Sequence, residues 1–160
     1  LADIRQEGQV WILDINEDNE KAVKTSASKR LVPVHPELER LGLLEYVQRL
    51  NKKGETRLFP ELKLQRDGYS QAAQKWFNAR YRHSCGISHR RKSFHSFRHT
   101  FINFLKQHNQ DGKKIAALAG HAEGSVTLER YGKPYPPEAL VELVKVIDYG
   151  LHLSKVFVAR

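Results

Sequence analysis

The sequence contains a single cysteine, no methionine and no long apolar run. With Cys85 alone, no disulfide can form within the chain, which is typical of a reducing, intracellular compartment. No apolar run is long enough to cross a bilayer, and no charged-then-apolar leader opens the chain, so no membrane partner is expected. Because a newly made protein starts with methionine, we expect these 160 residues to be a piece of something longer.

Acidic residues are absent from one long stretch, residues 68–110, in a chain whose formal net charge is +9. A basic balance suits a polyanion partner, either nucleic acid or an anionic membrane. A solvated surface normally intersperses both signs, so a one-signed stretch of this length favours a phosphate-facing surface. The candidate DNA-binding residues in it are Lys75, Arg80, Arg82, Arg90, Arg91 and Lys92.

The first third of the chain has the pattern of a small sheet. Residues 9–15 are apolar and β-branched, a short strand is expected near 22–24, and residues 29–34 form a third. Together they predict a three-stranded antiparallel meander near the N-terminus, with Pro33 placing the last strand at an edge.

The remainder is helical in its periodicity. Apolar residues recur at helical spacing between residues 38 and 50, and a basic helix carrying Trp76 and Phe77 is expected over 70–82. Ser93 is the expected cap of a helix held in the core by Phe97 and Phe101. Two more helices are predicted, over 113–119, ended by Gly120, and over 140–147. The fold class predicted is α+β, mainly α, as one domain spanning residues 1–160.

Two polar sites are predicted at helix ends. His95 and Arg98 are three residues apart, so on a helix they project to the same side. Arginine offers a planar fork of donors that fits two phosphate oxygens, and the histidine adds a further donor or acceptor. His121 directly follows Gly120 at the end of an apolar helix. The His95 and Arg98 pair also fits a basic helix end with a buried histidine.

Two further candidates lie in turns. Tyr131 follows His121 by ten residues, in Arg130-Tyr131-Gly132-Lys133, and prolines after it keep it outside a packed strand or helix. Lys24 lies at the tip of the expected hairpin, in Lys24-Thr25-Ser26-Ala27-Ser28-Lys29-Arg30. A lone tyrosine is usually structural and a turn lysine is ordinarily a solvated charge, so neither indicates chemistry by itself.

Taken in order along the chain, these pieces resemble the tyrosine recombinase (phage integrase) family. The hairpin from Val23-Lys24-Thr25 to Arg30-Leu31-Val32-Pro33-Val34-His35 looks like the family's catalytic-lysine hairpin. The run His95-Ser96-Phe97-Arg98 is similar to its His-x-x-Arg box, Leu118-Ala119-Gly120-His121 to its next box, and Thr127–Lys133 to its nucleophile segment. The interval from His121 to Tyr131 is slightly longer than the commonest family version.

The resemblance implies an enzyme that cuts and rejoins double-stranded DNA through a 3′-phosphotyrosine on Tyr131, without a cofactor or metal. The implied catalytic residues are Tyr131, Arg98, His95, His121 and Lys24. It also implies further recombinase protomers as partners, as a tetramer on DNA. A bacterial or phage-encoded protein in the cytoplasm, associated with the nucleoid, is the expected setting.

The family carries another arginine in a helix just ahead of the segment that begins here as Leu1-Ala2-Asp3-Ile4, and an N-terminal DNA-binding domain before that. Arg5 does not match that arginine. We therefore expect the catalytic domain to be truncated at its N-terminus, and the 160 residues alone to be inactive or nearly so.

Three alternatives remain open on the sequence. Cys85, His89, His95 and His99 could stabilise a DNA-binding module by holding zinc, although the paired cysteines of a typical finger are missing. The domain could also be a DNA-binding relic of the same fold without catalysis. A type IB topoisomerase has similar chemistry, but the His121 and Tyr131 segments look more like an integrase.

Overall fold

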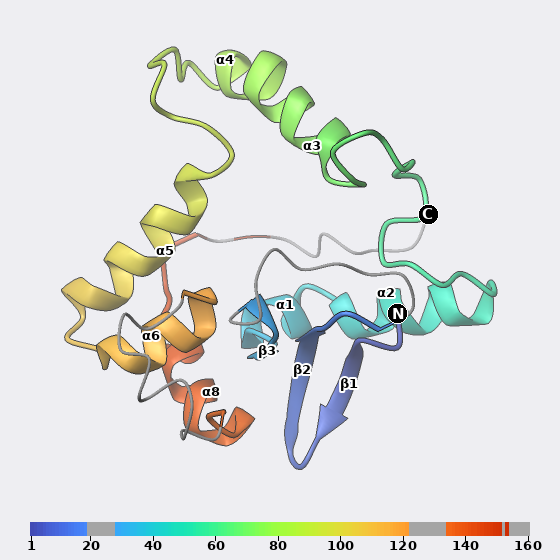
Figure 1. Ribbon diagram of the computed structural model, residues 1–160, viewed down its shortest axis with the longest axis vertical. Coiled ribbons are helices and arrows are strands. Elements are labelled where there is room, and N and C mark those ends of the chain that lie inside the picture. The colour runs from blue at the N-terminus through green and yellow to red at the C-terminus, as the bar shows by residue number, and fades with distance from the viewer. Residues whose placement is uncertain (19–27, 122–133, 152, 154–160) are drawn as a thin grey trace.

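The computed structural model describes residues 1–18, 28–121, 134–151 and 153. A small antiparallel sheet lies near the N-terminus, with helices around it and one group of helices standing apart (Figure 1). The mixture of helices with a small N-terminal sheet that the sequence predicts is confirmed. Within these ranges, no helix is both long and apolar enough to cross a membrane.

The sheet consists of β1 (Ile4–Glu7), β2 (Val10–Ile15) and β3 (Arg30–Pro33), in the order β1-β2-β3. Gly8, with φ of +59°, opens the two-residue turn between β1 and β2. The strand predicted over 9–15 and the edge position of Pro33 are confirmed. The polar sequence of β1 has no strand signal of its own, and its pairing with β2 is what makes it a strand.

The predicted meander is wrong in its order. Leu13 of β2 pairs directly with Val32 of β3, so no strand near 22–24 lies between them. Residues 22–24 themselves lie outside the described residues. The prediction assumes that strands consecutive in the chain pair with one another. In the structure the other neighbour of β2 is β1, which precedes it.

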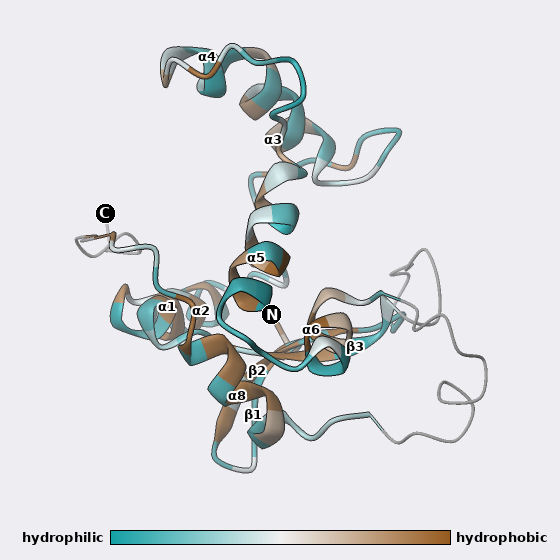
Figure 2. Ribbon diagram, turned by 90° about the vertical axis from the view of Figure 1, so that its left-hand side faces the viewer, coloured by the Kyte–Doolittle hydropathy of each residue, from teal (hydrophilic) through white to brown (hydrophobic). Residues whose placement is uncertain are grey.

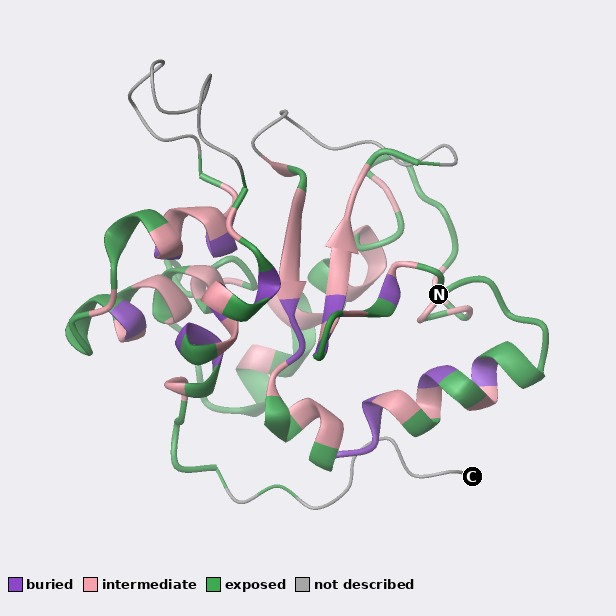
Figure 3. Ribbon diagram, turned by 90° about the horizontal axis from the view of Figure 1, so that it is seen from below, coloured by how far each residue is buried: buried purple, intermediate pink, exposed green. Residues whose placement is uncertain are grey.

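The strand β3 connects two apolar cores. On one side Val32 packs against the core shared by α5 (Ser96–Gln107), α6 (Gly112–Ala119) and α8 (Pro137–Lys145). On the other side Val34 is buried with Ile4 and with the helix α2 (Leu43–Lys52). Figure 3 shows buried positions on the sheet and on the helices around it. The end of β3 and the residue directly after it therefore contact both cores.

The helical pattern over 38–50 is divided into α1 (Pro36–Arg40) and α2. Gly42 has φ of +95°, a left-handed conformation that an α-helix cannot contain, so the chain turns there. The sequence predicts the helical spacing on both sides of this glycine. The break follows from the backbone conformation, and after it Leu43 and Val47 of α2 pack into the core that includes Ile4 of β1.

The basic helix expected over 70–82 is present as α3 (Gln71–Trp76), a π-helical turn η2 (Phe77–Tyr81) and α4 (Arg82–Ser84). We call residues 71–92, these helices and the loop after them, the basic arm. It contributes no residue to either buried core. Figures 1 and 2 both show α3 and α4 standing apart from the sheet and from α8.

Two expectations about α5 are wrong. Ser93 does not cap this helix, because its amide donates to the hydroxyl of Ser96 at 3.0 Å and the N-cap residue is His95. Phe97 is not in the core, since it is 60% exposed, whereas Phe101 does pack against the core. Phe97 instead faces the aromatic rings of the basic arm. The predicted end of α6 at Gly120 is confirmed, and Asp111 caps its start.

Candidate functional site

The first part of the site is the beginning of α5. His95 is the N-cap residue and is exposed, and Arg98, half-buried, lies in the first turn, where its amide donates to the His95 carbonyl at 3.1 Å. The His95 ring also lies edge-on to that of His99, with 5.1 Å between the ring centroids. The helix start therefore carries two histidines and an arginine within one turn.

The second part is the end of α6. Gly120 adopts a left-handed conformation, with φ of +64°, and its amide donates to the Ala117 carbonyl at 3.2 Å. The amide of His121 donates to the Ala116 carbonyl at 3.0 Å. These two bonds are the pattern of a Schellman motif, which ends a helix in a defined direction. His121 thus leaves α6 along a set path, with its side chain exposed.

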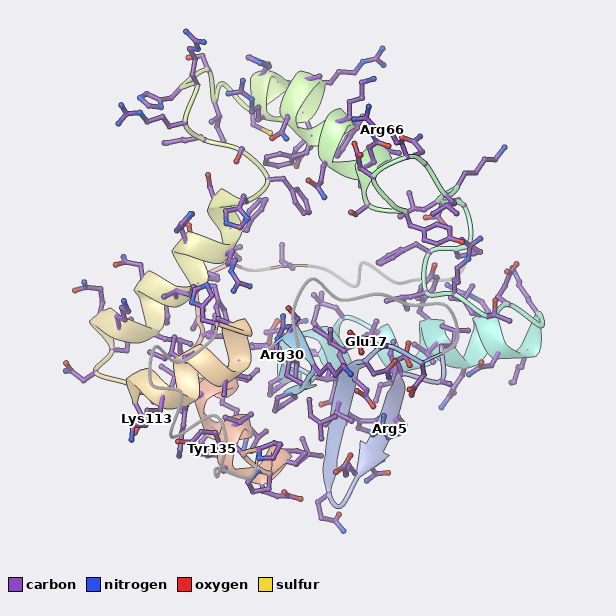
Figure 4. The ribbon with its side chains drawn as sticks, in the orientation of Figure 1. Arg5, Glu17, Arg30, Arg66, Lys113 and Tyr135 are labelled. Carbon is purple, nitrogen blue, oxygen red and sulfur yellow. The ribbon has the colours of Figure 1, made fainter. Side chains whose placement is uncertain are left out.

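The third part is Arg30, the first residue of β3, which the sequence analysis did not single out. Its Nε donates to the Leu118 carbonyl at 2.9 Å, 88 residues away, and its Nη1 donates to the Ser28 carbonyl at 2.6 Å. Figure 4 shows Arg30 between the sheet and α6. An arginine before an apolar alternating strand was the available signal, but its partner on α6 could not be read from the chain.

Electrostatic interactions connect these three parts. Burial lowers the pKa of the Arg30 guanidinium, and the nearby charge of Arg98 lowers it further. The pKa of the His121 imidazole is lowered by partial loss of solvent and then by positive charges, first Arg98, then Lys106, Arg30 and His95. The imidazole is therefore neutral at pH 7, inside a group of cations.

No carboxylate neutralises this group among the described residues. The ion pairs there join other residues: Arg5 with Glu7 and Asp14, Lys29 with Glu17, Arg40 with Glu37, Arg66 with Asp67, and Lys145 with Glu142. Like charges held together without a counter-charge repel one another, and an anion that enters removes that repulsion. A neutral imidazole beside two guanidinium groups can accept or donate a hydrogen bond, so the arrangement suits a phosphate.

The structure brings three of the five predicted catalytic residues, His95, Arg98 and His121, to one place. Lys24 and Tyr131 lie outside the described residues. The described chain resumes at Ser28, whose carbonyl accepts from Arg30 beside the site.

The predicted DNA-binding residues lie on the basic arm. Arg82 is half-buried and donates to the carbonyls of Asn78 at 2.8 Å and His89 at 3.1 Å, so its guanidinium holds the loop after α4. The remaining five side chains are exposed: Lys75, Arg80, Arg90, Arg91 and Lys92. The arm therefore presents positive charge from one helix and one loop.

An aromatic cluster joins the basic arm to the start of α5. The ring of Phe77 lies 5.5 Å from that of Phe94 and 5.3 Å from that of Phe97, between centroids. The side-chain oxygen of Asn78 also accepts from the Phe94 amide at 2.9 Å. The arm is thus attached to the same helix start that carries His95 and Arg98.

The zinc-stabilised alternative finds no support. No group of three or more histidine, cysteine or acidic side chains placed to hold a metal ion occurs in the described ranges, which include Cys85, His89, His95 and His99. Cys85 is a free, exposed thiol beyond the end of α4.

An α+β domain with a basic site that lacks a carboxylate partner among the described residues, beside a basic arm, suits a polyanion. The model of the phage integrase family matches residues 1–137. Because that match covers most of the chain, the protein belongs to this family, the tyrosine recombinases, whose general activity is site-specific DNA recombination. Neither the curated proteins nor the solved structures searched give a significant match.

The charge arrangement can be tested on His121 directly. In Arg98→Gln, the pKa of His121 should rise toward its ordinary value, because a nearby positive charge that disfavours the imidazolium is removed. The measurement is an NMR titration of the His121 ring proton without DNA. Lys113→Gln, which removes an exposed charge at the other end of α6, is the matched control and should leave the midpoint in place. An unchanged midpoint in Arg98→Gln would show that the two side chains do not face each other.

Proposed function

We propose that the protein cuts and rejoins DNA strands at specific sites through a 3′-phosphotyrosine intermediate on Tyr131. The observation that carries this proposal is the convergence of His95, Arg98 and His121 at one basic site in a chain of the phage integrase family. The order of the sequence motifs adds Lys24 and Tyr131 to that site.

The chemistry explains these residue types. The Tyr131 oxygen attacks the scissile phosphorus, the bond from phosphorus to the 5′ oxygen breaks, and the leaving oxygen takes a proton from Lys24. Arg98 and His121 hold the two non-bridging oxygens, whose charge grows in the transition state. His95, beside Arg98, assists the loss of the tyrosine proton or holds that arginine. The covalent bond conserves the energy of the phosphodiester, so resealing needs no ATP.

The exposed cations of the basic arm would contact the DNA backbone on either side of the cut. Phosphate contacts position a protein on a duplex and carry no sequence information themselves. As parts of the same proposal, we assign a tetramer on double-stranded DNA as the working state, and the cytoplasm, in association with the nucleoid, as the location of a bacterial or phage-encoded protein.

The direct test is covalent trapping on a nicked suicide substrate, in which the cut strand diffuses away and leaves the protein attached to DNA. The assay uses the full-length protein, meaning the product of the whole gene with any residues upstream of Leu1. The 160 residues alone should form little adduct, because the family uses a further arginine, from a helix ahead of the segment that begins here at Leu1, to bind the phosphate. A DNA complex without any adduct from the full-length protein would indicate a binding function only.

The basic arm should control affinity and not chemistry. Replacing Arg90, Arg91 and Lys92 by glutamine should weaken binding to duplexes of any sequence and flatten its dependence on salt, because fewer counterions are released. Fluorescence anisotropy at several salt concentrations measures both. Replacing Lys52 and Lys53, exposed lysines at the end of α2, is the matched control. Equal salt slopes for the arm variant and the wild type would remove the arm from the DNA interface.

A further inference from the structure

Arg30 completes the end of α6. A helix leaves its last carbonyl groups without helical partners. Here the carbonyls of Ala116 and Ala117 accept the amides of His121 and Gly120, and the carbonyl of Leu118 accepts Arg30 Nε at 2.9 Å. The side chain on β3 therefore closes the turn from which His121 emerges.

The guanidinium also packs against the glycine of that turn. A Cβ atom added to Gly120 would lie 2.5 Å from Arg30 Nη1 and 2.9 Å from Cζ, and the φ of +64° already disfavours any side chain. The other end of the fork holds the Ser28 carbonyl at 2.6 Å. Arg30 thus fixes the position of the turn relative to the sheet, which both cores hold in place.

We propose that Arg30 is a positioning residue, which places the His121 imidazole beside Arg98 by holding the turn at the end of α6. The proposal rests on the function proposed above, in which His121 contacts the phosphate. Arginine suits the task because it keeps its charge when half-buried and directs several donors from one plane. Lysine would bring the charge without the fork.

The first experiment compares Arg30→Met with the wild type in single-turnover cleavage of the suicide substrate by the full-length protein. The rate constant at saturating DNA should fall about 10²-fold, as expected when a contacting group is misplaced by about 1 Å. The DNA affinity and the final amount of adduct should equal those of the wild type. Loss of folded protein would lower the amount instead of the rate constant, so the two effects separate.

Arg57→Met is the matched control. Arg57 is exposed and donates to the Leu62 carbonyl at 3.3 Å, away from α6. The Arg57→Met variant loses the same charge and the same kind of hydrogen bond to a backbone carbonyl as Arg30→Met, yet it should cleave at the wild-type rate. If Arg57→Met is as slow as Arg30→Met, general loss of charge explains both, and the positioning role is wrong.

A double-mutant cycle tests whether Arg30 acts through His121. His121→Ala removes a donor aimed at the phosphate and should slow cleavage by about 10²–10³-fold. If Arg30 works by placing that imidazole, Arg30→Met/His121→Ala should be no slower than His121→Ala, because the second change has nothing left to misplace. Defects that multiply would overturn the proposal.

Arg30→Lys keeps the charge and most of the aliphatic stem. It replaces Arg30→Met in each of these experiments if the methionine variant does not fold. We expect it to remain well below the wild-type rate, because one ammonium cannot hold both carbonyls in the same directions. A wild-type rate for Arg30→Lys would overturn the positioning role. A wild-type protein that forms no adduct overturns the proposed function, whereas normal cleavage by the Arg30 variants overturns this inference alone.

Discussion

Tyr131→Phe in the full-length protein is expected to abolish the covalent adduct with DNA completely while leaving DNA affinity intact. The phenyl ring keeps the volume and the apolar contacts of tyrosine, and only the hydroxyl that attacks the phosphate is lost. A denaturing gel after incubation with the nicked suicide substrate reports the adduct, and anisotropy reports binding. No other effect should be as large, because without the nucleophile no covalent intermediate can form.

Tyr135→Phe is the matched control for this loss. Tyr135 lies four residues further along the chain, is half-buried, and packs against the core of α5, α6 and α8. Its variant should form adduct at close to the wild-type rate. An adduct that persists in Tyr131→Phe, or disappears only in Tyr135→Phe, would remove Tyr131 from the role of nucleophile.

The second large effect is expected from Lys24→Ala, which should slow cleavage by about 10²–10⁴-fold because the leaving oxygen loses its proton donor. A substrate with sulfur at the 5′-bridging position has a better leaving group and needs less protonation. The variant should therefore cleave the sulfur substrate nearly as fast as the wild type does. Equal defects on the oxygen and sulfur substrates would contradict a general-acid role.

Lys29→Ala provides the control for Lys24→Ala within the same segment. The ammonium group of Lys29 pairs with the carboxylate of Glu17 and is exposed, so its charge is already engaged on the surface. Its removal should leave cleavage of both substrates close to the wild-type rate. If Lys29→Ala cleaved the oxygen substrate slowly and the sulfur substrate at the wild-type rate, Lys29 and not Lys24 would be the proton donor.

The parts of the fold that could be predicted are those with a local physical signal. Alternating and helical apolar spacing predicted β2, α6 and α8, and Gly120 predicted the end of α6, because each depends on neighbours a few residues away. The strand β1 and the break at Gly42 were missed. Pairing with β2, a contact outside β1 itself, makes β1 a strand, whereas the break lies in the left-handed backbone of Gly42 within an otherwise helical apolar spacing.

The site divides in the same way. The sequence was enough to select His95, Arg98 and His121 as candidates, because a phosphate requires hydrogen-bond donors and these residues supply them at predicted helix ends. The helical spacing placed His95 and Arg98 on one side, but the convergence of His121 with them was implied only by family resemblance. The role of Arg30 could not be predicted, because its partner, the Leu118 carbonyl, lies 88 residues further along the chain.

The sequence by itself determined that this protein is basic, that α6 ends at Gly120, and that its motifs follow the order of the phage integrase family. Only the tertiary structure decided that β3 lies between two cores, that Phe97 faces the basic arm, and that Arg30 meets α6. The reason is physical. Charge, capping and periodicity act over a few residues, whereas a hydrogen bond between residues 88 positions apart exists only after the strand and the helix have packed on a shared core.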